Sequence, residues 1–442
     1  MRNLLRRLRY RLTNLCPISA RFDSLQNQLD ALISSLDSTR RELRNKPSKE
    51  TLLELIGQSR NEHLRNGCLG PSTPSIPAGE SETKEDTRET SFVGPTIDRI
   101  GFLVQSSELL NHFGSVFDLL PPESFDVLIL GDTEESRLIL SRVAHWKCNV
   151  VSVTDTLNNG TRYRYLVSNH PVRVYDEPLI KQLALKNVRF MYSAGKSGWN
   201  LRDWNGLYDV ILCFGPYHAA AFAECSDAAI VQMGYPRFDK YFSVTGDKCD
   251  LRQRFNCNAS KETVVWLPTW KSLSSVGRFD QEVANLTASY NVVVKLHPLM
   301  IGSEPDRVEA LKRFSFTSLI LDASDNTPLY SLADFLLCDY GGPPLAGIYT
   351  DKNLLLLNVP DAEGDELTGE NSPDLEIRKH IVNVNAEDSG IARILADRTV
   401  WEAQKFARRM LRRKYFAPYF GFSSQVAAST LLNLDNILGK GG

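Results

Sequence analysis

From about residue 97 onward, the chain alternates short apolar runs with helix-length amphipathic segments. The first apolar runs read RIGFLV, FDVLIL, NVVSV, NVRFMY, YDVILCF and AAIVQMG, and segments such as SSELLNHFGSVFDLL between them have helical spacing. Strands that are apolar throughout are typical of a parallel sheet that helices cover on both faces. The pattern therefore predicts an α/β domain over residues 97–245.

The same alternation starts again after about residue 246. Its apolar runs read TVVWLPT, YNVVVKLHP, SLILD, DFLLCDY, KNLLLLNV and HIVNV, and a long helical segment follows from about residue 400 to residue 438. Two such series of comparable length predict two Rossmann-like parallel-sheet domains. We assign the second domain, with its terminal helices, to residues 246–442.

The first 66 residues have a different pattern. Residues 1–15 place leucines on one helical face beside arginines with no acidic neighbour, which is typical of a basic helix lying on an anionic membrane. A charged leading turn of the next helix is the alternative. Residues 22–43 repeat apolar positions at steps of three and four, which predicts either a coiled coil between chains or a helix packed on the protein itself. Residues 67–96, rich in Pro, Gly, Ser, Thr and acidic side chains, predict a flexible linker.

Composition narrows the protein class. Hydrophobic residues are 42% and charged residues 24% of the chain, as in ordinary globular proteins, which excludes wholesale disorder and a polytopic membrane protein. The balance of 51 basic and 53 acidic side chains argues against a whole-protein nucleic-acid binder. None of the eight cysteines forms a CxxC pair, which disfavours a zinc ribbon. We expect a cytoplasmic protein, on the inner face of the membrane if residues 1–15 contact lipid.

Residues suited to binding phosphate follow three strands of the second predicted domain. In an open parallel sheet, ligands bind beyond the carboxyl ends of the strands. Glycines there let a ligand approach the backbone and the first N–H groups of the next helix, while Lys or His neutralises charge on a leaving pyrophosphate. Pro298 is expected to end its strand and free the residues before it. The candidates are Thr269, Lys271, Lys295, His297, Asp339, Tyr340, Gly341 and Gly342.

Several cofactor and nucleotide motifs are absent. Gly195-Lys196-Ser197 resembles the end of a Walker loop, but Phe190 stands where that loop needs its first glycine. No GxGxxG follows the first strand and no HExxH occurs, so we predict neither a dinucleotide cofactor nor a metal. A basic cluster near the C-terminus either meets an anionic acceptor or membrane or is a solvated helix face. It comprises Arg408, Arg409, Arg412, Arg413 and Lys414.

Four segments resemble, in order, motifs of the CDP-glycerol glycerophosphotransferases, the teichoic-acid primases and polymerases. They are GYPRFDKYF (234–242), WLPTWK (266–271), VKLHP (294–298) and LYSLADFLLCDYGG (329–342). The resemblance covers about residues 205–435. It implies the two-Rossmann architecture called GT-B, with a nucleotide-diphosphate donor in the cleft between the domains.

The resemblance also implies roles for single residues. His297 matches the family's donor-phosphate histidine. Arg237 lies in the first of the four segments, and we expect it to bind the donor. Asp339 and Tyr340 match the Asp-Tyr of the family's DYSS motif, in which Gly341 and Gly342 replace the serines.

The family's proposed general base, a histidine before a glycine in the first domain, is replaced by Ala194. His218 and His170 are substitutes, and each has a structural role as the alternative.

The leading hypothesis is a transferase that moves glycerol phosphate, or a related polyol phosphate or sugar, from a CDP-glycerol-like donor to a polymer or lipid-linked acceptor in cell-surface polymer synthesis. The first alternative is a nucleotide-sugar glycosyltransferase or epimerase of the same fold. The second is a degenerate GT-B body that binds a partner. Expected partners besides the substrates are a membrane, through residues 1–15, and a second copy, through residues 22–43, but no nucleic acid.

Overall fold

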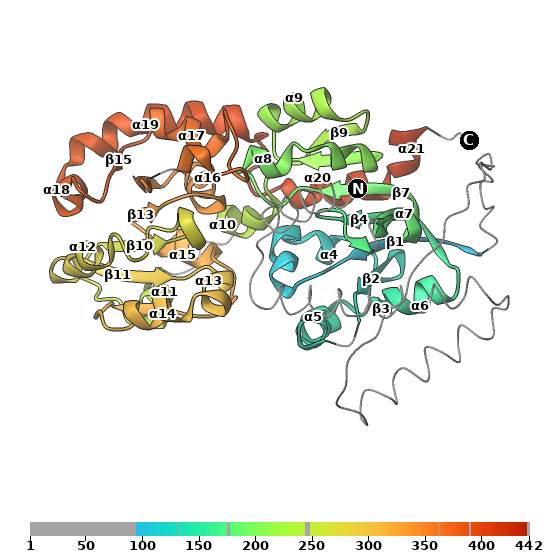
Figure 1. Ribbon diagram of the computed structural model, residues 1–442, viewed down its shortest axis with the longest axis horizontal. Coiled ribbons are helices and arrows are strands. Elements are labelled where there is room, and N and C mark those ends of the chain that lie inside the picture. The colour runs from blue at the N-terminus through green and yellow to red at the C-terminus, as the bar shows by residue number, and fades with distance from the viewer. Residues whose placement is uncertain are drawn as a thin grey trace, which may run out of the picture. The chain divides into compact units, whose positions relative to one another are not determined.

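The computed structural model describes residues 94–131, 133–174, 177–243, 248–360, 362–388 and 390–439. The predicted basic helix and coiled coil lie outside these residues, as does most of the predicted linker. The described chain contains two large sheets, and every strand pair within each of them is parallel (Figure 1). The prediction of an α/β fold with two parallel sheets is therefore confirmed.

The first sheet has seven strands in the order β3-β2-β1-β4-β7-β8-β9. Its strands are β1 (Thr96–Leu103), β2 (Phe125–Ile129), β3 (Asn149–Ser152), β4 (Arg162–Ser168), β7 (Ala184–Phe190), β8 (Val210–Cys213) and β9 (Ala229–Gln232). A small antiparallel pair, β5 (Arg173–Val174) and β6 (Glu177–Pro178), stands apart from it. The helices of this part are α4 (Val116–Leu119), α5 (Glu134–Val143), α6 (Val153–Asn158), α7 (Leu179–Leu183), α8 (Ser197–Asn200), α9 (Pro216–Cys225) and α10 (Asp239–Ser243).

The second sheet has six strands in the order β12-β11-β10-β13-β14-β15. Its strands are β10 (Thr263–Leu267), β11 (Asn291–Lys295), β12 (Ser318–Ile320), β13 (Phe335–Cys338), β14 (Asn353–Leu357) and β15 (Asn383–Val384). The helices that follow are α11 (Lys248–Arg254), α12 (Asp280–Asn285), α13 (Pro298–Ser303), α14 (Pro305–Leu311), α15 (Thr327–Leu332), α16 (Gly342–Tyr349), α17 (Pro373–Glu376), α18 (Ile391–Ala396), α19 (Arg398–Tyr415), α20 (Ser423–Leu432) and α21 (Leu434–Leu438).

The strand order of the second sheet determines where a ligand would bind. The chain builds outward from β10 to β12, then returns and builds the other half from β13. The direction of strand order thus reverses between β10 and β13, and open α/β sheets bind ligands at the carboxyl ends beside such a reversal. The loops after β10 and β13, which hold most of the predicted phosphate-binding residues, lie at this point.

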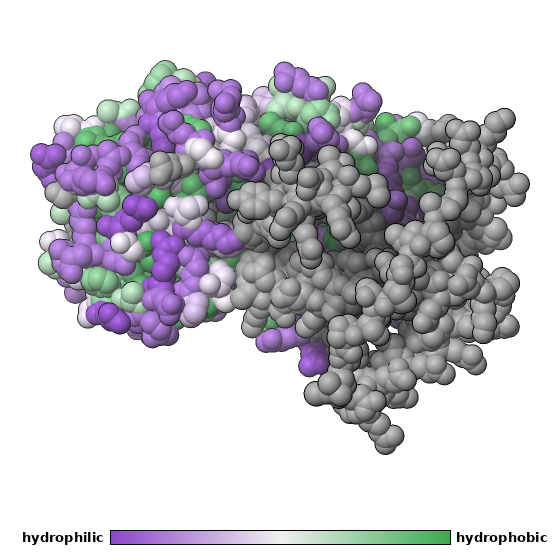
Figure 2. Space-filling model, in the orientation of Figure 1, coloured by the Kyte–Doolittle hydropathy of each residue, from purple (hydrophilic) through white to green (hydrophobic). Residues whose placement is uncertain are grey.

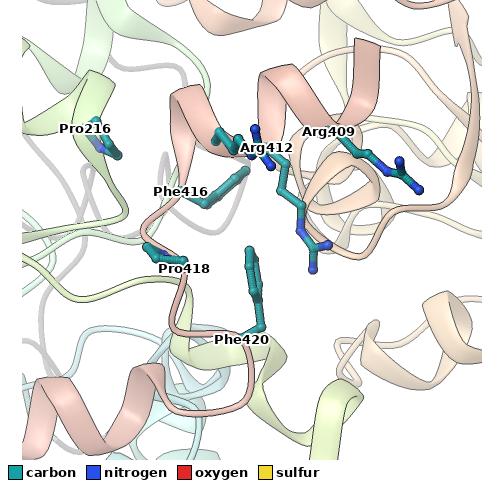
Figure 3. A pocket seen from close by; sticks show the side chains of 7 residues that line it. Pro216, Arg409, Arg412, Phe416, Pro418 and Phe420 are labelled. Atoms are coloured by element: carbon teal, nitrogen blue, oxygen red, sulfur yellow. The ribbon is translucent and has the colours of Figure 1, made fainter. Parts of the chain in front are cut away.

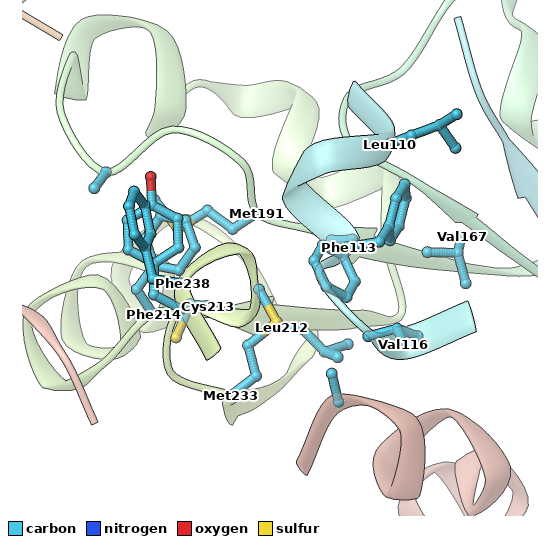
Figure 4. Packing of buried hydrophobic residues seen from close by; sticks show 14 of the residues in the cluster. Leu110, Phe113, Val116, Val167, Met191, Leu212, Cys213, Phe214, Met233 and Phe238 are labelled. Atoms are coloured by element: carbon cyan, nitrogen blue, oxygen red, sulfur yellow. The ribbon is translucent and has the colours of Figure 1, made fainter. Parts of the chain in front are cut away.

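The inner strands of the two sheets are buried, as their continuous apolar sequences predict, whereas the edge strands β3, β9 and β12 are partly exposed. Every residue of β2, β8, β10, β11 and β13 is buried. In the first part of the fold, Leu110 and Phe113 from one helical segment pack with Val167 and Leu212 from two strands (Figure 4). Burial of each such side chain contributes about 1.5–3 kcal/mol, so the paired sheet cores form a rigid base for the loops at their edges.

The hydropathy of the surface and of the helices shows how polar this part of the chain is. The face of the second sheet and its helices that Figure 2 shows is mainly hydrophilic, with scattered apolar spots. Among the helices of the described ranges, none is long and apolar enough to cross a bilayer.

The last helices return to elements of the first sheet. Asp239 of α10 accepts hydrogen bonds from the first two N–H groups of α20, those of Ser423 (3.0 Å) and Ser424. The Ser424 hydroxyl accepts one from the N–H of Ser115, just before α4. Asp435 of α21 forms an ion pair with Arg164 of β4 at 2.8 Å. The domain division at residue 245 stays a prediction, and these contacts show that the C-terminal helices complete the first half of the fold.

The connection between α19 and α20 passes very close to the turn between β8 and α9. The N–H of Ala417 donates to the carbonyl of Phe214 at 2.8 Å. A Cβ on Gly215 would lie 2.5 Å from the nitrogen of Ala417 and 2.6 Å from the carbonyl carbon of Phe416. Only glycine leaves room for this approach, so Gly215 allows the connecting segment to attach to the first sheet.

We therefore predict that Gly215→Ala lowers the free energy of unfolding by about 1–3 kcal/mol, because backbone atoms must move to admit the methyl group. Urea denaturation of the full chain measures the change as a shift in the transition midpoint. Gly206→Ala is the matched control, because a Cβ there would meet nothing within 4 Å. Equal midpoints for the two variants would show that the close contact does not constrain the fold.

Candidate functional site

The carboxylate of Asp339 joins the two loops that flank the strand-order reversal. One oxygen accepts hydrogen bonds from the N–H groups of Thr269 (2.7 Å) and Tyr340 (2.8 Å), and the other accepts from the N–H (2.7 Å) and hydroxyl (2.8 Å) of Ser275. Burial raises the pKa of Asp339 to about 6, although these hydrogen bonds act in the opposite direction. With both oxygens occupied, Asp339 positions the Thr269 loop, and its predicted contact with a donor stays a prediction.

The glycines after Asp339 border open space at the start of α16. Gly341 has φ +97°, a conformation that favours glycine, and its N–H donates to Asp374 at 2.8 Å. A Cβ on Gly341 would lie 3.8 Å from Cε of Lys196 and 3.9 Å from the hydroxyl of Thr269, while one on Gly342 would meet nothing within 4 Å. The backbone at the start of this eight-residue helix is therefore accessible between a hydroxyl and a lysine side chain, a combination that suits an anion.

His297 lies beside this space as a neutral hydrogen-bond donor. β11 ends at Lys295 and α13 begins at Pro298, the strand ending that Pro298 predicts. The ring of His297 stacks on Trp270 with centroids 6.0 Å apart, and its Nδ1 accepts the N–H of Leu299 at 3.1 Å. Burial lowers the pKa of His297 to about 4, so the ring is neutral at pH 7. Because Nδ1 accepts a hydrogen bond, the ring proton resides on Nε2, which can donate to a phosphate oxygen.

Lys196 is the cation of this site that the sequence analysis did not select. It comes from the loop after β7 and has φ +56°, and its N–H donates to Asp374 at 3.1 Å. Its ammonium has no hydrogen-bond partner among the described residues, and its charge contributes to the low pKa of His297. The one sequence feature that includes this lysine, Gly195-Lys196-Ser197, lacks the rest of a Walker loop and therefore predicts no phosphate contact.

Asp374 holds Lys196 and Gly341 together. One of its oxygens accepts from the N–H of Gly341 and the other from the N–H of Lys196, so a single fully buried carboxylate links the loops after β13 and β7. A Cβ on Gly195 would lie 2.4 Å from this carboxylate. Gly195 is therefore required for the close approach that brings the lysine to the second sheet.

Three other predicted donor-binding side chains are engaged within the protein. Lys295 donates to the main-chain carbonyl of Asp322. The ring of Tyr340 lies under the guanidinium of Arg378, 3.6 Å from its centroid. Lys271 holds its ammonium 4.6 Å from the ring centroid of Trp270. Their roles as donor ligands stay predictions.

Arg237 is also engaged, between two carboxylates. Its Nε donates to Asp325 at 3.0 Å and one terminal nitrogen donates to Glu108 at 3.3 Å. Burial would lower the pKa of Arg237, but the two carboxylates outweigh it and raise that pKa above its ordinary value. Glu108 belongs to the 3-10 helix Ser107–Phe113 after β1, whereas Asp325 follows β12. Arg237 therefore joins the two halves of the fold, and its role as a donor ligand stays a prediction.

His218 contacts the backbone of Ala194. Its Nε2 donates to the carbonyl of Ala194 at 2.9 Å, while its Nδ1 is buried without a partner among the described residues. The residue is only 2% exposed, and burial lowers its pKa to about 4. Burial likewise lowers the pKa of His170 to about 4. Catalysis by His218 stays a prediction, and its burial weighs against direct contact with an acceptor.

The structure thus brings together Thr269, Gly341, Gly342 and His297 from the sequence prediction, and adds Lys196. This set has hydrogen-bond donors and a positive charge, and the carboxylate of Glu108 lies near enough to His297 to act on its pKa. Within the described ranges, no group of three or more His, Cys, Asp or Glu side chains could hold a metal ion. The arrangement is suited to binding a phosphate group through donors and charge.

Parts of the chain are similar to known proteins. Residues 201–342 match the family model of the CDP-glycerol:poly(glycerophosphate) glycerophosphotransferases. The teichoic acid glycerol-phosphate primase of Bacillus spizizenii is 25% identical over 188 residues, which are 40% of this chain and 46% of that protein. The chain thus matches about half the length of this relative. The predicted resemblance to the family is confirmed.

The fold is also similar to a solved structure of this kind. The wall teichoic acid polymerase TagF matches with a TM-score of 0.54 and 13% identity, over 77% of this chain and 89% of that one. A variant of the same polymerase matches with a TM-score of 0.55 and 12% identity, over the same shares. At this identity the likeness shows the fold, and the predicted GT-B architecture is confirmed.

We predict that His297 titrates with a pKa of about 4, well below the ordinary value of about 6.5. Nitrogen-15 NMR of the imidazoles in the full chain, assigned with a His297→Gln variant, measures this pKa and the tautomer. We expect the proton on Nε2 at pH 7. Because the unfolded chain binds this proton at higher pH, His297 lowers the folding stability as pH falls from about 6.5 to 4. A ring that titrates near 6.5 would contradict the neutral assignment.

Proposed function

We propose that this chain transfers glycerol phosphate, or a related polyol phosphate, from a nucleotide-diphosphate donor to a hydroxyl group of an acceptor in cell-surface polymer synthesis. The observation that carries the proposal is the open space at the start of α16, bordered by Lys196, Thr269 and Gly341 and next to His297. The match to a teichoic acid primase supports glycerol phosphate as the transferred group. A structure of a TagF variant soaked with CDPG supports a cytidine donor.

The reaction forms one bond and breaks one. The acceptor hydroxyl oxygen attacks the phosphorus that carries glycerol, the P–O–P bridge breaks, and cytidine monophosphate leaves with the bridging oxygen. The hydroxyl proton passes to a base or to solvent. Negative charge grows on the leaving phosphate, where the ammonium of Lys196, Nε2–H of His297 and the N–H of Gly342 can stabilise it.

This chemistry explains how the site can act with Ala194 in place of the family's histidine. Phosphoryl transfer generally proceeds through a loose transition state, in which positioning and electrostatic stabilisation supply most of the catalysis. Removal of the acceptor proton is then a smaller part of the barrier. His218 remains our candidate base, and its unpartnered Nδ1 is the atom that would accept the proton.

Ala194 also favours the second candidate, a degenerate body that binds a partner. A thermal-shift series with CDP-glycerol, CDP, UDP and GDP separates the two, because a ligand that binds only the folded state raises the melting temperature. We expect the largest shift with CDP-glycerol. A flat response to all four nucleotides would reject the transferase proposal.

Two further expectations concern residues outside the described ranges. We propose that residues 1–15 bring the protein to the inner face of the cell membrane, where a lipid-linked acceptor would be found, and that residues 22–43 pair two chains. The basic and apolar composition of the first segment and the heptad spacing of the second support these proposals.

We predict that His297→Ala keeps the fold, weakens nucleotide binding modestly and lowers turnover about 100- to 1000-fold, as does removal of a preorganised donor in other enzymes. Release of nucleotide from CDP-glycerol and the melting temperature are measured on one preparation. His145→Ala, at an exposed histidine, is the control. Normal turnover with a lower melting temperature would mean that His297 only ends a strand.

We predict that Lys196→Gln lowers turnover at least about tenfold and weakens CDP binding, because an ammonium beside the phosphates is lost. Lys196→Arg should restore part of the activity by restoring the charge. Lys186→Gln, which removes an exposed lysine paired with Asp209, should leave both quantities unchanged. Equal activity of Lys196→Gln and Lys186→Gln would exclude Lys196 from the donor site.

A further inference from the structure

A pocket lies where the C-terminal end of α19 meets the start of α9, and none of its lining residues belongs to the site at the start of α16. Its volume is about 500 Å³. Figure 3 shows Arg412 extending beside Phe420, with Phe416 and Pro418 on the connecting segment and Pro216 across from them. The lining residues are Pro216, Arg409, Arg412, Arg413, Phe416, Pro418 and Phe420. Three of these seven are arginines, and none is acidic.

None of these arginines forms an ion pair with another of the described residues, although the carboxylate of Asp351 lies near enough to Arg412 to act on its charge. The other basic residues of α19 have carboxylate partners: Lys405 pairs with Glu402 at 2.7 Å, Arg408 with Asp351 at 2.8 Å and Lys414 with Glu376 at 3.1 Å. No such pair is found for Arg409, Arg412 or Arg413 among the described residues. The other basic side chains of α19 are thus paired with carboxylates, whereas the three guanidinium groups that line the pocket form no ion pair among the described residues.

Contacts with aromatic side chains fix the residues that line the pocket. The guanidinium of Arg412 stacks over Phe420, 3.7 Å from the ring centroid, and its Nε lacks a hydrogen-bond partner among the described residues. Phe416 is 2% exposed, and the bond from the N–H of Ala417 to Phe214 fixes the segment that carries it. A ligand would meet a preformed surface, which lowers the entropy cost of binding.

Exposed apolar side chains continue from the pocket along α19. Phe406 is 78% exposed and Met410 is 41% exposed. They precede Arg413 by seven and three residues, a spacing that places all three on the same side of the helix. Apolar and cationic groups thus alternate on a surface with no protein partner among the described residues.

We propose that this pocket binds a phosphate ester whose organic part is apolar, at a site separate from the donor site. Guanidinium groups bind phosphate oxygens through paired, charge-assisted hydrogen bonds, and three of them suit a phosphodiester. The rings of Pro418 and Phe420 cover the apolar part of the ligand. A lipid headgroup in a membrane and a soluble phosphate ester share this chemistry, and the experiment distinguishes them.

The experiment measures binding of dihexanoyl phosphatidylglycerol, kept below its micelle concentration, to the full chain by isothermal titration. The variant is Arg409→Gln with Arg413→Gln, two exposed side chains whose loss should leave the fold intact. We expect affinity to fall at least about tenfold. The control is Arg398→Gln with Lys405→Gln, which removes the same charge from the same helix outside the pocket and should retain the affinity.

Two further measurements test where the probe binds and whether the ligand is a membrane lipid. Lys196→Gln should retain binding, because the probe does not occupy the donor site, and no turnover enters the measurement. Binding to vesicles of phosphatidylglycerol, compared with vesicles of phosphatidylcholine, shows whether the ligand is a membrane lipid. Weaker vesicle binding by the Arg409/Arg413 variant supports a lipid headgroup. If the variant loses binding only to the soluble probe, the result supports a soluble phosphate ester. The proposal is wrong if the soluble probe does not saturate, if the control loses as much affinity, or if Lys196→Gln abolishes binding.

Discussion

The candidate site depends on the buried carboxylate of Asp374, which binds the N–H of Gly341 with one oxygen and the N–H of Lys196 with the other. Burial raises the pKa of Asp374, and the charge of Arg378 and these two hydrogen bonds oppose this rise without cancelling it. Arg378 in turn donates to the carbonyl of Asp374 at 2.7 Å. Because the partners come from the loops after β13 and β7, this carboxylate is what lets a lysine from one half of the fold lie beside the phosphate-binding backbone of the other.

Two side chains of the candidate site are suited to stabilising a phosphate in different ways, one through its charge and the other as a neutral hydrogen-bond donor. His297 is partly buried, stacks on Trp270 and lies near two lysines. Burial and the lysines disfavour an imidazolium and outweigh the carboxylate of Glu108, so His297 contributes Nε2–H rather than charge. Lys196 supplies the cation. A donor that stays neutral over the physiological pH range keeps its hydrogen bond independent of pH, while the lysine compensates the growing charge of the leaving group.

The sheets and the position of the site could be predicted from the sequence because their causes are local. Continuous apolar runs predict the strands, and Pro298 and Gly341 indicate where two of them end. The side-chain partners could not be predicted, because they depend on contacts between residues far apart in the chain. Asp374 is 178 residues from Lys196, and no pattern around it indicates a link. For the same reason Arg237 and Lys295 looked available for phosphate, although Asp325, Glu108 and Asp322 engage them in the folded protein.

The most direct test of the account is the identity of the nucleotide released when the full chain is incubated with CDP-glycerol and a glycerol-phosphate-primed acceptor, followed by phosphorus-31 NMR. Attack at the phosphorus that carries glycerol breaks the P–O–P bridge, so the account predicts cytidine monophosphate together with a new phosphodiester on the acceptor. Cytidine diphosphate would mean that a carbon–oxygen bond breaks, as in sugar transfer. That product, or the absence of any released nucleotide, would contradict the account.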